Sequence, residues 1–298
     1  MRILRLSRPI LASMAMVAIC LLFTGHLAAA ATSQNITLSP SSTQFDVAAG
    51  TTTINKFDVI NEGDTSFDVG ISSAPYYVKG LEYDPHFTQL AGTLNASEWV
   101  KFLSPTTQSL DANKLTTIDY SLSVPENTPA GGYYAVLFAE TIPKISSGVV
   151  ARNRVGNILY ITVKGDIKQS GSVSVGKLGF FNTAASIPLT VFVSNTGGTH
   201  FITTANVMVK DIFGHTAYKG TSDRYVLPQT TRQVDFSWSP TTPIDAYSIT
   251  TTATVAGTEK SVPVRWILVV QPWVLIVFIL AVGGIIASII IRKGGKKK

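Results

Sequence analysis

Three short motifs occur twice in this 298-residue chain, in the same order each time. The pairs are Val59-x-Asn61-x-Gly63-x-Thr65-x-Phe67 with Val193-x-Asn195-x-Gly197-x-Thr199-x-Phe201, then Ile118–Ser123 with Val234–Ser239, then Thr128–Tyr133 with Thr242–Tyr247. Asn and Gly tolerate the positive φ of a tight turn, so the first motif predicts a strand that ends, turns and returns. Three matches in one order indicate a duplicated domain.

Between its two ends the chain alternates apolar and polar side chains in short stretches, which Gly, Pro and Asn interrupt. We expect strands at Thr53–Ile60, Ser66–Ile71, Thr116–Val124, Tyr133–Phe138, Asn157–Val163, Leu189–Ser194, Ala205–Val209, Arg232–Trp238 and Ser248–Val255. Many short strands separated by turns favour β-sandwiches. The prediction is an all-β fold: two tandem immunoglobulin-like β-sandwiches, residues 32–165 and 166–263, plus one C-terminal transmembrane helix.

The first copy carries an insertion that the second lacks. The offset between matching residues falls from 134 at Phe67 to 116 at Ile118, so the first copy has 18 more residues between these positions. The excess falls within Ser72–Leu110, and a long, aromatic-rich excursion on a sandwich is typical of a functional loop. We therefore predict ligand binding there, through Tyr76, Tyr77, Tyr83 and Trp99. The alternative is that these aromatic side chains cover a sheet edge or the junction between the domains.

The net positive charge of the chain lies at its two ends. The terminal basic residues are Arg2, Arg5, Arg8, Arg292, Lys293, Lys296, Lys297 and Lys298. Without these 8, the body has 16 basic against 18 acidic residues, which argues against a nucleic-acid partner. Residues 1–31 combine a basic head, an apolar stretch and the small residues Ala28–Ala31, as in a cleaved secretory signal peptide. An uncleaved N-terminal anchor is the alternative.

Residues 273–291 are apolar, and as a helix they would reach roughly 28 Å, enough to cross a membrane. We expect residues 264–272 to be a juxtamembrane segment and residues 292–298 to be a basic cytoplasmic tail, with the bulk of the chain extracellular. The residues expected at the membrane interfaces are Trp266, Trp273, Arg292 and Lys293. A patch of small residues would allow a homodimer through Gly283, Gly284 and Ala287.

Catalytic motifs are missing from the sequence. It has no Gly-x-Ser-x-Gly elbow, phosphate loop or dinucleotide fingerprint, and its one cysteine, Cys20, lies in the signal peptide. His86, His200 and His215 lack metal-ligand spacing, so we expect no metal, no cofactor and no enzyme activity. The remote alternative is a cell-wall hydrolase, because a glycosidase needs only two carboxylates. Leu227–Thr231 is similar to a sortase sorting signal without its final glycine, and we interpret it as a turn between strands.

Three further stretches carry a resemblance to a known family: Phe57–Gly63, Val124–Tyr134 and Arg154–Gly165. With these, and with its signal peptide, two domains, span and lysine-rich tail, the chain resembles the WxL-interacting proteins of Gram-positive cell surfaces. Those proteins pair a peptidoglycan-binding domain with a second immunoglobulin-like domain. The resemblance implies a noncatalytic role in binding the cell wall or a surface protein. Segment Ser72–Leu110 does not match the family, so the resemblance implies no ligand-binding residue.

The sequence therefore predicts a membrane-anchored extracellular binding or scaffold protein. Its first sandwich would bind cell-wall glycan (peptidoglycan) or a secreted surface protein, because aromatic faces can stack on sugar rings. One alternative is a chaperone-like module that adds a partner's strand to an open sheet edge. The other is a passive stalk that holds a partner away from the membrane.

Overall fold

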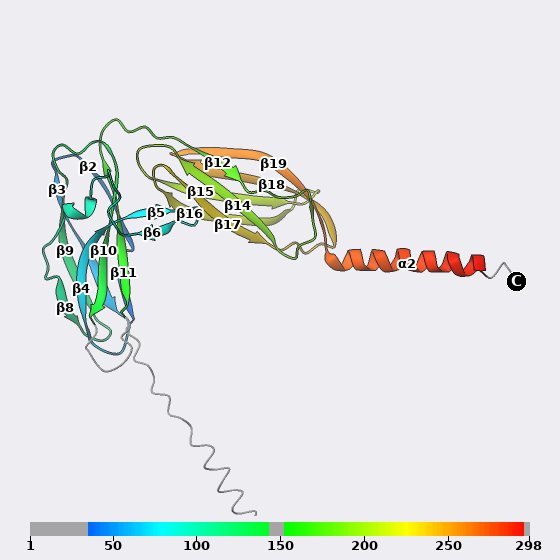
Figure 1. Cartoon of the computed structure of the whole chain (residues 1–298), viewed down its shortest axis with the longest axis horizontal. Helices are drawn as coiled ribbons and strands as arrows, with labels where there is room; N and C mark the ends of the chain where they lie inside the picture. The colour runs from blue at the N-terminus through cyan, green and yellow to red at the C-terminus, as the bar shows by residue number, and fades with distance from the viewer. Residues whose placement is uncertain (1–34, 143–151, 295–298) are drawn as a thin grey trace, which may run out of the picture.

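A computed structural model describes residues 35–142 and 152–294. These residues form two β-sandwiches, one after the other along the chain, and α2 (Pro272–Gly294) leaves the far end of the second sandwich (Figure 1). The fold predicted from the sequence, all-β with two immunoglobulin-like sandwiches and a C-terminal helix, is confirmed. The signal peptide expected at residues 1–31 and Lys296–Lys298 of the expected tail lie outside the described residues.

The first sandwich packs a four-stranded sheet against a five-stranded one. The first sheet has the order β1 (Ile36–Ser39), β3 (Thr52–Asn61), β9 (Leu115–Ser123), β7 (Val100–Phe102). The second has the order β2 (Ser42–Val47), β11 (Arg154–Val163), β10 (Gly131–Ile142), β4 (Phe67–Pro75), β8 (Thr107–Leu110). Only β2 and β11 pair in parallel. Inward-facing side chains from both sheets, such as Phe57, Tyr120 and Leu137, form one hydrophobic core.

The second sandwich repeats this strand order. One sheet has the order β12 (Gly171–Val175), β14 (Ile187–Asn195), β17 (Thr230–Trp238). The other has the order β13 (Phe181–Asn182), β19 (Thr258–Val270), β18 (Ile244–Val255), β15 (Phe201–Lys210), β16 (Thr216–Val226). Here too one short strand, β13, pairs in parallel with the last strand of its domain. A separate core forms around Val191, Trp238 and Tyr247.

The repeated Asn-x-Gly motif forms the same buried corner in both sandwiches. The side-chain amide of Asn61 donates to three backbone carbonyls at 2.9, 3.2 and 3.0 Å, and its oxygen accepts from the N–H of Gly63 at 2.9 Å. Asn195 donates to two backbone carbonyls at 2.8 and 2.9 Å and accepts from the N–H of Gly197 at 2.8 Å. Each Asn side chain is therefore satisfied inside its domain, as a buried polar group must be.

The insertion Ser72–Leu110 contains the end of one strand and five short elements. It supplies the end of β4, the hairpin of β5 (Tyr77–Lys79) and β6 (Asp84–His86), the 3₁₀ helix η1 (Ala96–Trp99), and the edge strands β7 and β8. The strands β7 and β8 extend the two sheets of the first sandwich. The β5–β6 hairpin instead projects from the first sandwich towards β16 of the second (Figure 1).

The C-terminal helix follows the second sandwich almost directly. The expected juxtamembrane segment, 264–272, is mostly strand, because β19 continues to Val270 with alternate side chains in the core. Among the described residues one helix, Pro272–Ile290, is long and apolar enough to cross a membrane, and none of it is buried in the protein. Trp266 on β19 and Trp273 on α2 are both exposed, which leaves their indole rings free to meet an interface. Arg292 and Lys293 lie near the end of α2.

The small-residue face of α2 is open within the part of the chain that the structure describes. A Cβ atom built on Gly283 or Gly284 would meet no atom within 4 Å, and Ala287 is exposed beside them. The homodimer predicted from these residues stays a prediction.

Candidate binding cleft between the sandwiches

The β5–β6 hairpin fastens the first sandwich to the second. At its tip the carbonyl of Leu81 accepts a hydrogen bond of 2.9 Å from the backbone N–H of Gln233 on β17. The hydroxyl of Tyr83 accepts from the N–H of Leu227 at 3.0 Å, and the guanidinium of Arg232 lies 4.3 Å from the centre of the Tyr83 ring. Tyr83 is buried by these contacts.

A cluster of aromatic rings fills the centre of the junction. Tyr160 of β11 and Tyr225 of β16 stack with their ring centres 4.0 Å apart and a 13° angle between the rings. The Tyr134 hydroxyl accepts a hydrogen bond from the N–H of His200 at 3.0 Å. Burial lowers the pKa of His200 to about 4, against an opposing effect of Asp46, and it raises the pKa of Tyr134 and Tyr160. The cluster is therefore uncharged at neutral pH.

Backbone groups also meet directly across the junction. The N–H of Gly132 donates to the carbonyl of Gly198 at 2.9 Å. A Cβ atom at Gly132 would lie 2.3 Å from the Tyr134 hydroxyl oxygen and 3.0 Å from the Cα of Thr199, so only glycine allows this approach. The hydroxyls of Thr162 and Thr199 are 3.2 Å apart and add a side-chain link.

Beside these contacts lies a cleft of about 660 Å³ between the two sandwiches. Its volume falls within the range of roughly 300–1,000 Å³ that small-ligand sites occupy. No Asp, Glu, Lys, Arg or His is among the described residues that line it, and four of the lining side chains are tyrosines. The tyrosine and glutamine side chains in the lining are those of Tyr76, Tyr77, Gln89, Tyr133, Tyr134 and Gln229. The cleft therefore suits a neutral, polar ligand with flat or cyclic parts.

The four ligand-binding residues predicted from the sequence occupy three different environments. Tyr76 and Tyr77 line the cleft and are partly exposed. Tyr83 is buried in the junction, as the alternative interpretation of the insertion expected. Trp99 is buried in the core of the first sandwich, with its ring centre 4.9 Å from that of Tyr133. The structure thus brings Tyr76 and Tyr77 together at the cleft and leaves Trp99 out of reach of a ligand there.

Sequence reasoning missed the other half of the cleft. Tyr133 and Tyr134 stand at the start of β10, outside the insertion, and Gln229 comes from the second sandwich. A partial signal was present: alternation along β10 puts the adjacent Tyr133 and Tyr134 on opposite faces of the sheet, so one of the two must lie outside the core of the sandwich. Gln229, in the turn predicted at Leu227–Thr231, gives no signal, because only the packing of one domain on the other brings it to the cleft. Its φ of 57° fits that turn.

The amide groups at the cleft are held in place by their own loops. The side-chain nitrogen of Gln229 donates to the carbonyls of Thr196 and Gly197 at 3.2 and 3.1 Å. The side-chain nitrogen of Gln89 donates to the carbonyl of Thr93 at 2.7 Å. The amide oxygens are then the groups left to accept hydrogen bonds from a ligand.

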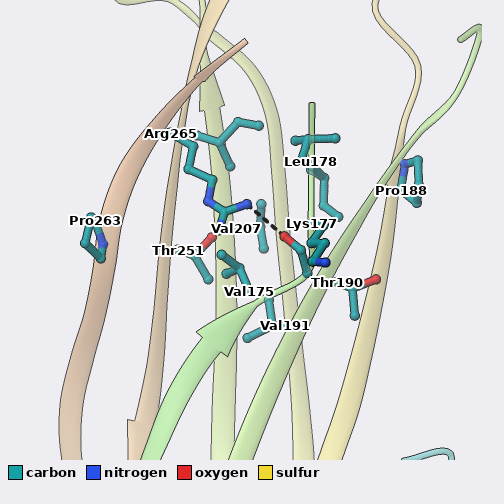
Figure 2. A pocket seen from close by; sticks show the side chains of 13 residues that line it. Val175, Lys177, Leu178, Pro188, Thr190, Val191, Val207, Thr251, Pro263 and Arg265 are labelled. Carbon is teal, nitrogen blue, oxygen red and sulfur yellow. Dashed lines mark hydrogen bonds between the residues drawn. The ribbon is translucent and has the colours of Figure 1, made fainter. Parts of the chain in front are cut away.

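A second, smaller cavity lies inside the second sandwich (Figure 2). It measures about 80 Å³ and is lined mainly by aliphatic side chains such as Val191, Val207 and Ile249. Arg265 crosses it and donates to the carbonyl of Gly176 at 2.8 Å, as the dashed line in Figure 2 shows. This space holds a few water molecules at most, so we take it as part of the domain's packing.

The cleft offers binding groups and no acid–base pair. Among the described residues, its lining contains no carboxylate or imidazole that could move a proton. Across the described residues, no group of three or more His, Cys, Asp or Glu side chains could hold a metal ion. The amide oxygens of Gln89 and Gln229 and the tyrosine rings can therefore hold a ligand in position by hydrogen bonding and stacking.

Comparison with known proteins gives matches to solved structures alone. No family model and no curated protein matches the chain. Among solved structures, the chain is similar to the CsuC–CsuE chaperone–tip adhesion subunit complex of Acinetobacter baumannii, with 14% identity over 80% of this chain and 99% of that one and a TM-score of 0.39. It is similar to the Escherichia coli chaperone DraB, with 12% identity over 80% and 98% and a TM-score of 0.39. It is also similar to the Salmonella enterica SafA pilin in complex with the SafB chaperone, with 12% identity over 81% and 99% and a TM-score of 0.39. Identity and TM-score are both low, so nothing about ligand or partner follows from these matches.

Proposed function

We propose that this chain is a noncatalytic binding module that a membrane helix anchors, and that its interdomain cleft takes a neutral cell-wall glycan. The observation that carries the proposal is the uncharged, tyrosine-lined cleft of about 660 Å³. A charged ligand would meet no charged side chain among the described lining residues, although Lys79 Nζ lies 5.6 Å from the centre of the Tyr77 ring, and a charge left unpaired in a partly desolvated site costs free energy. A glycan has hydroxyl groups and flat sugar faces, so it matches amide oxygens and tyrosine rings.

Tyr77 is the side chain we expect to contact the sugar most directly. It is partly exposed at the cleft, and its ring is held flat against His86, with ring centres 5.1 Å apart and a 15° angle between the planes. A ring held in place loses little conformational entropy on binding. Gln89 from the first sandwich and Gln229 from the second would accept hydrogen bonds from the hydroxyls of the glycan.

The location we propose is the outer side of a cell membrane. The exposed apolar helix Pro272–Ile290 supports a single span, and the basic residues from Arg292 onwards favour a cytoplasmic end under the positive-inside rule. The expected signal peptide at residues 1–31 would export the sandwiches. A wall-binding role of this kind is also what the resemblance to the WxL-interacting proteins implies.

Sedimentation of the full chain with purified cell walls tests the glycan proposal. Wild-type protein should pellet with the walls, and Tyr77→Ala should weaken binding about tenfold, as expected for loss of one well-packed aromatic contact. Tyr77→Phe keeps the ring and should bind as the wild type does. Ile54→Ala removes an exposed apolar side chain outside the cleft and is the control. If the wild-type chain stays in the supernatant, the glycan proposal is wrong.

A second candidate function, addition of a partner's strand, is favoured by the edge strand β16. Its residues Thr216–Val226 pair only with β15 within the described sheets. The carbonyl of Tyr225 points away from β15, because it accepts from Arg232 at 2.9 Å. Since backbone groups alternate along a strand, the N–H of Thr221 also points outward, where a partner's backbone could pair with it.

A proline at position 221 separates the two functions. Thr221→Pro removes an outward N–H and leaves the pairing between β15 and β16 in place. If a partner strand binds at this edge, a photo-crosslinker at Lys219 should capture one protein in cells, and Thr221→Pro should abolish that capture. Wall sedimentation should not change in the same variant. Capture that survives Thr221→Pro would contradict strand addition at β16.

A further inference from the structure

Several large apolar side chains are exposed at the end of the second sandwich from which α2 leaves. They are Phe180, Phe181, Phe213 and Ile244, with exposed fractions of 66, 53, 78 and 56%. Ile244 pairs with Val270, the last residue of β19, and Phe181 pairs with Leu268, two residues before it. At about 3.3 Å per residue, the positions of Ile244 and Phe181, measured along the axis of β19, lie within about 7 Å of the end of that strand.

Phe213 reaches the same end on a different element. It stands at the tip of the hairpin between β15 and β16, which extends beyond the pairing of Lys210 with Ser248 towards the start of β18. The tip is held by Asp211, whose carboxylate accepts from the N–H groups of Phe213 and His215 at 2.9 and 2.8 Å. The turn therefore presents Phe213 to the outside in a fixed position, as the most exposed of these four side chains.

The connection between this end and α2 leaves little freedom. Only Gln271 separates β19 from the helix. Its N–H donates to the carbonyl of Pro243 and its side-chain amide to the carbonyl of Pro240, both at 2.8 Å, while its own carbonyl accepts from the N–H of Val274 at 3.0 Å. If α2 crosses a membrane, the exposed aromatic residues must lie close to the lipid surface.

We infer that Phe180, Phe181, Phe213 and Ile244 form a membrane-docking surface that enters the headgroup layer of the bilayer in which α2 is anchored. The inference rests on the membrane anchoring proposed above. Phe and aliphatic side chains on a protein surface that meets a bilayer can bury themselves at the boundary between headgroups and acyl chains, where they leave water. The occupant of this surface is lipid because only Gln271 lies between the end of β19, beside these side chains, and the exposed apolar helix α2. Docking would fix the tilt of the second sandwich and hold the cleft at a set height above the membrane.

Fluorescent labels on single cysteines in the full chain test this inference. Cys20→Ser removes the only native cysteine. One cysteine is then placed at position 181 or 213, at exposed position 221 in the middle of β16 as a control, or at position 279 inside α2. Each variant is labelled with an environment-sensitive dye and reconstituted into vesicles of phosphatidylcholine and phosphatidylglycerol that carry a quencher at the headgroup or on the acyl chain.

Docking predicts that headgroup quenching at positions 181 and 213 exceeds that at position 221 by at least about twofold, while acyl-chain quenching is strongest at position 279. Equal headgroup quenching at positions 181, 213 and 221, together with a quenched label at position 279, would overturn docking and leave the anchor intact. An unquenched label at position 279 would instead overturn the membrane anchoring itself. Labels at positions 181 and 213 that are shielded from a water-soluble quencher but not reached by either lipid quencher would assign the surface to a second protein copy and contradict lipid docking.

Discussion

Tyr160 and Tyr225 stack face to face across the domain junction, with ring centres 4.0 Å apart, although 65 residues of chain separate them. One ring comes from the last strand of the first sandwich and the other from the edge strand of the second. The cleft has walls from both sandwiches. Its shape therefore depends on this stacking contact and on the contacts of Tyr83 with Leu227 and Arg232. A binding site of this kind is only as well defined as the angle between its domains.

Loss of the Tyr225 ring should loosen the junction. Tyr225→Ala removes an aromatic pair that contributes about 0.5–1.5 kcal/mol beyond its buried area. We expect a broader distribution of distances between spin labels placed one on each sandwich, measured by double electron–electron resonance. Tyr225→Phe keeps the stack and loses only the hydroxyl that meets Gln44, so it is the matched control. An unchanged distribution in Tyr225→Ala would mean that other contacts fix the domain angle.

The hydroxyl of Tyr83 should matter more than its position on a surface hairpin suggests. Tyr83→Phe leaves the buried N–H of Leu227 without its acceptor, and an unsatisfied buried donor costs about 1–3 kcal/mol. We expect a lower urea midpoint for unfolding of the full chain. Tyr77→Phe is the control, since it removes a hydroxyl with no hydrogen-bond partner within the described protein. Equal urea midpoints for Tyr83→Phe and Tyr77→Phe would contradict a stabilising role for the hydrogen bond between Tyr83 and Leu227.

The sequence predicted the centre of each sandwich well and its edges poorly. All nine expected strands overlap observed ones, because central strands bury one face and so alternate strictly. The edge strand β16 escaped because two of its half-buried positions are Gly220 and Ser222, which carry no large apolar side chain, so the apolar–polar alternation is weak in the sequence. Strand β19, which pairs with β13 and β18 on its two sides, escaped for a different reason. Its apolar residues Trp266–Val270 lie close in sequence to the expected membrane span, so the sequence alone assigns them to the juxtamembrane segment 264–272.

The cleft could be predicted only in part. Tyr76 and Tyr77 could be predicted from the sequence, because an insertion rich in aromatic residues stands out when the first copy is compared with the second. Trp99 has the same composition signal, yet it faces the core, because η1 packs against β4, β9 and β10. No property of the insertion alone distinguishes a ring that faces a ligand from one that faces the core. Gln229 could not be found at all, since its role depends on the contact between domains.

The paired asparagine corners give a test of the duplication. Asn61→Ala and Asn195→Ala each remove a buried amide that holds several backbone groups, so each should lower the free energy of unfolding by about 2–4 kcal/mol. Differential scanning calorimetry should show which sandwich melts early in each variant. Asn55→Ala on β3 is the control, because Asn55 is only partly buried. If Asn61→Ala or Asn195→Ala melts at the same temperature as the wild type, the two Asn-x-Gly motifs do not stabilise their sandwiches equally.

Trp99 and Tyr77 should separate stability from binding. Trp99→Ala empties a large volume in the first core and should cost about 3–5 kcal/mol, whereas Tyr77→Ala on the cleft surface should cost about 1 kcal/mol or less. Urea denaturation followed by tryptophan fluorescence and circular dichroism measures both. Any loss of wall binding in Trp99→Ala should then track the unfolded fraction. Lost binding by a fully folded Trp99→Ala variant would show that this residue contacts the ligand after all.

His200 should make the junction sensitive to acid. Its pKa is about 4 in the folded chain, because burial disfavours the charged ring, against about 6.5 when unfolded. Above pH 6.5 both states are neutral and His200 has no effect. As the pH falls from 6.5 to 4, only the unfolded chain takes up the proton, so the free energy of unfolding should fall by on the order of 3 kcal/mol. Urea titrations at a series of pH values measure this slope. His200→Phe keeps a ring beside Tyr160 and Tyr225 but cannot be protonated, so it should flatten the slope in that window, and an unchanged slope would assign the acid sensitivity to other groups.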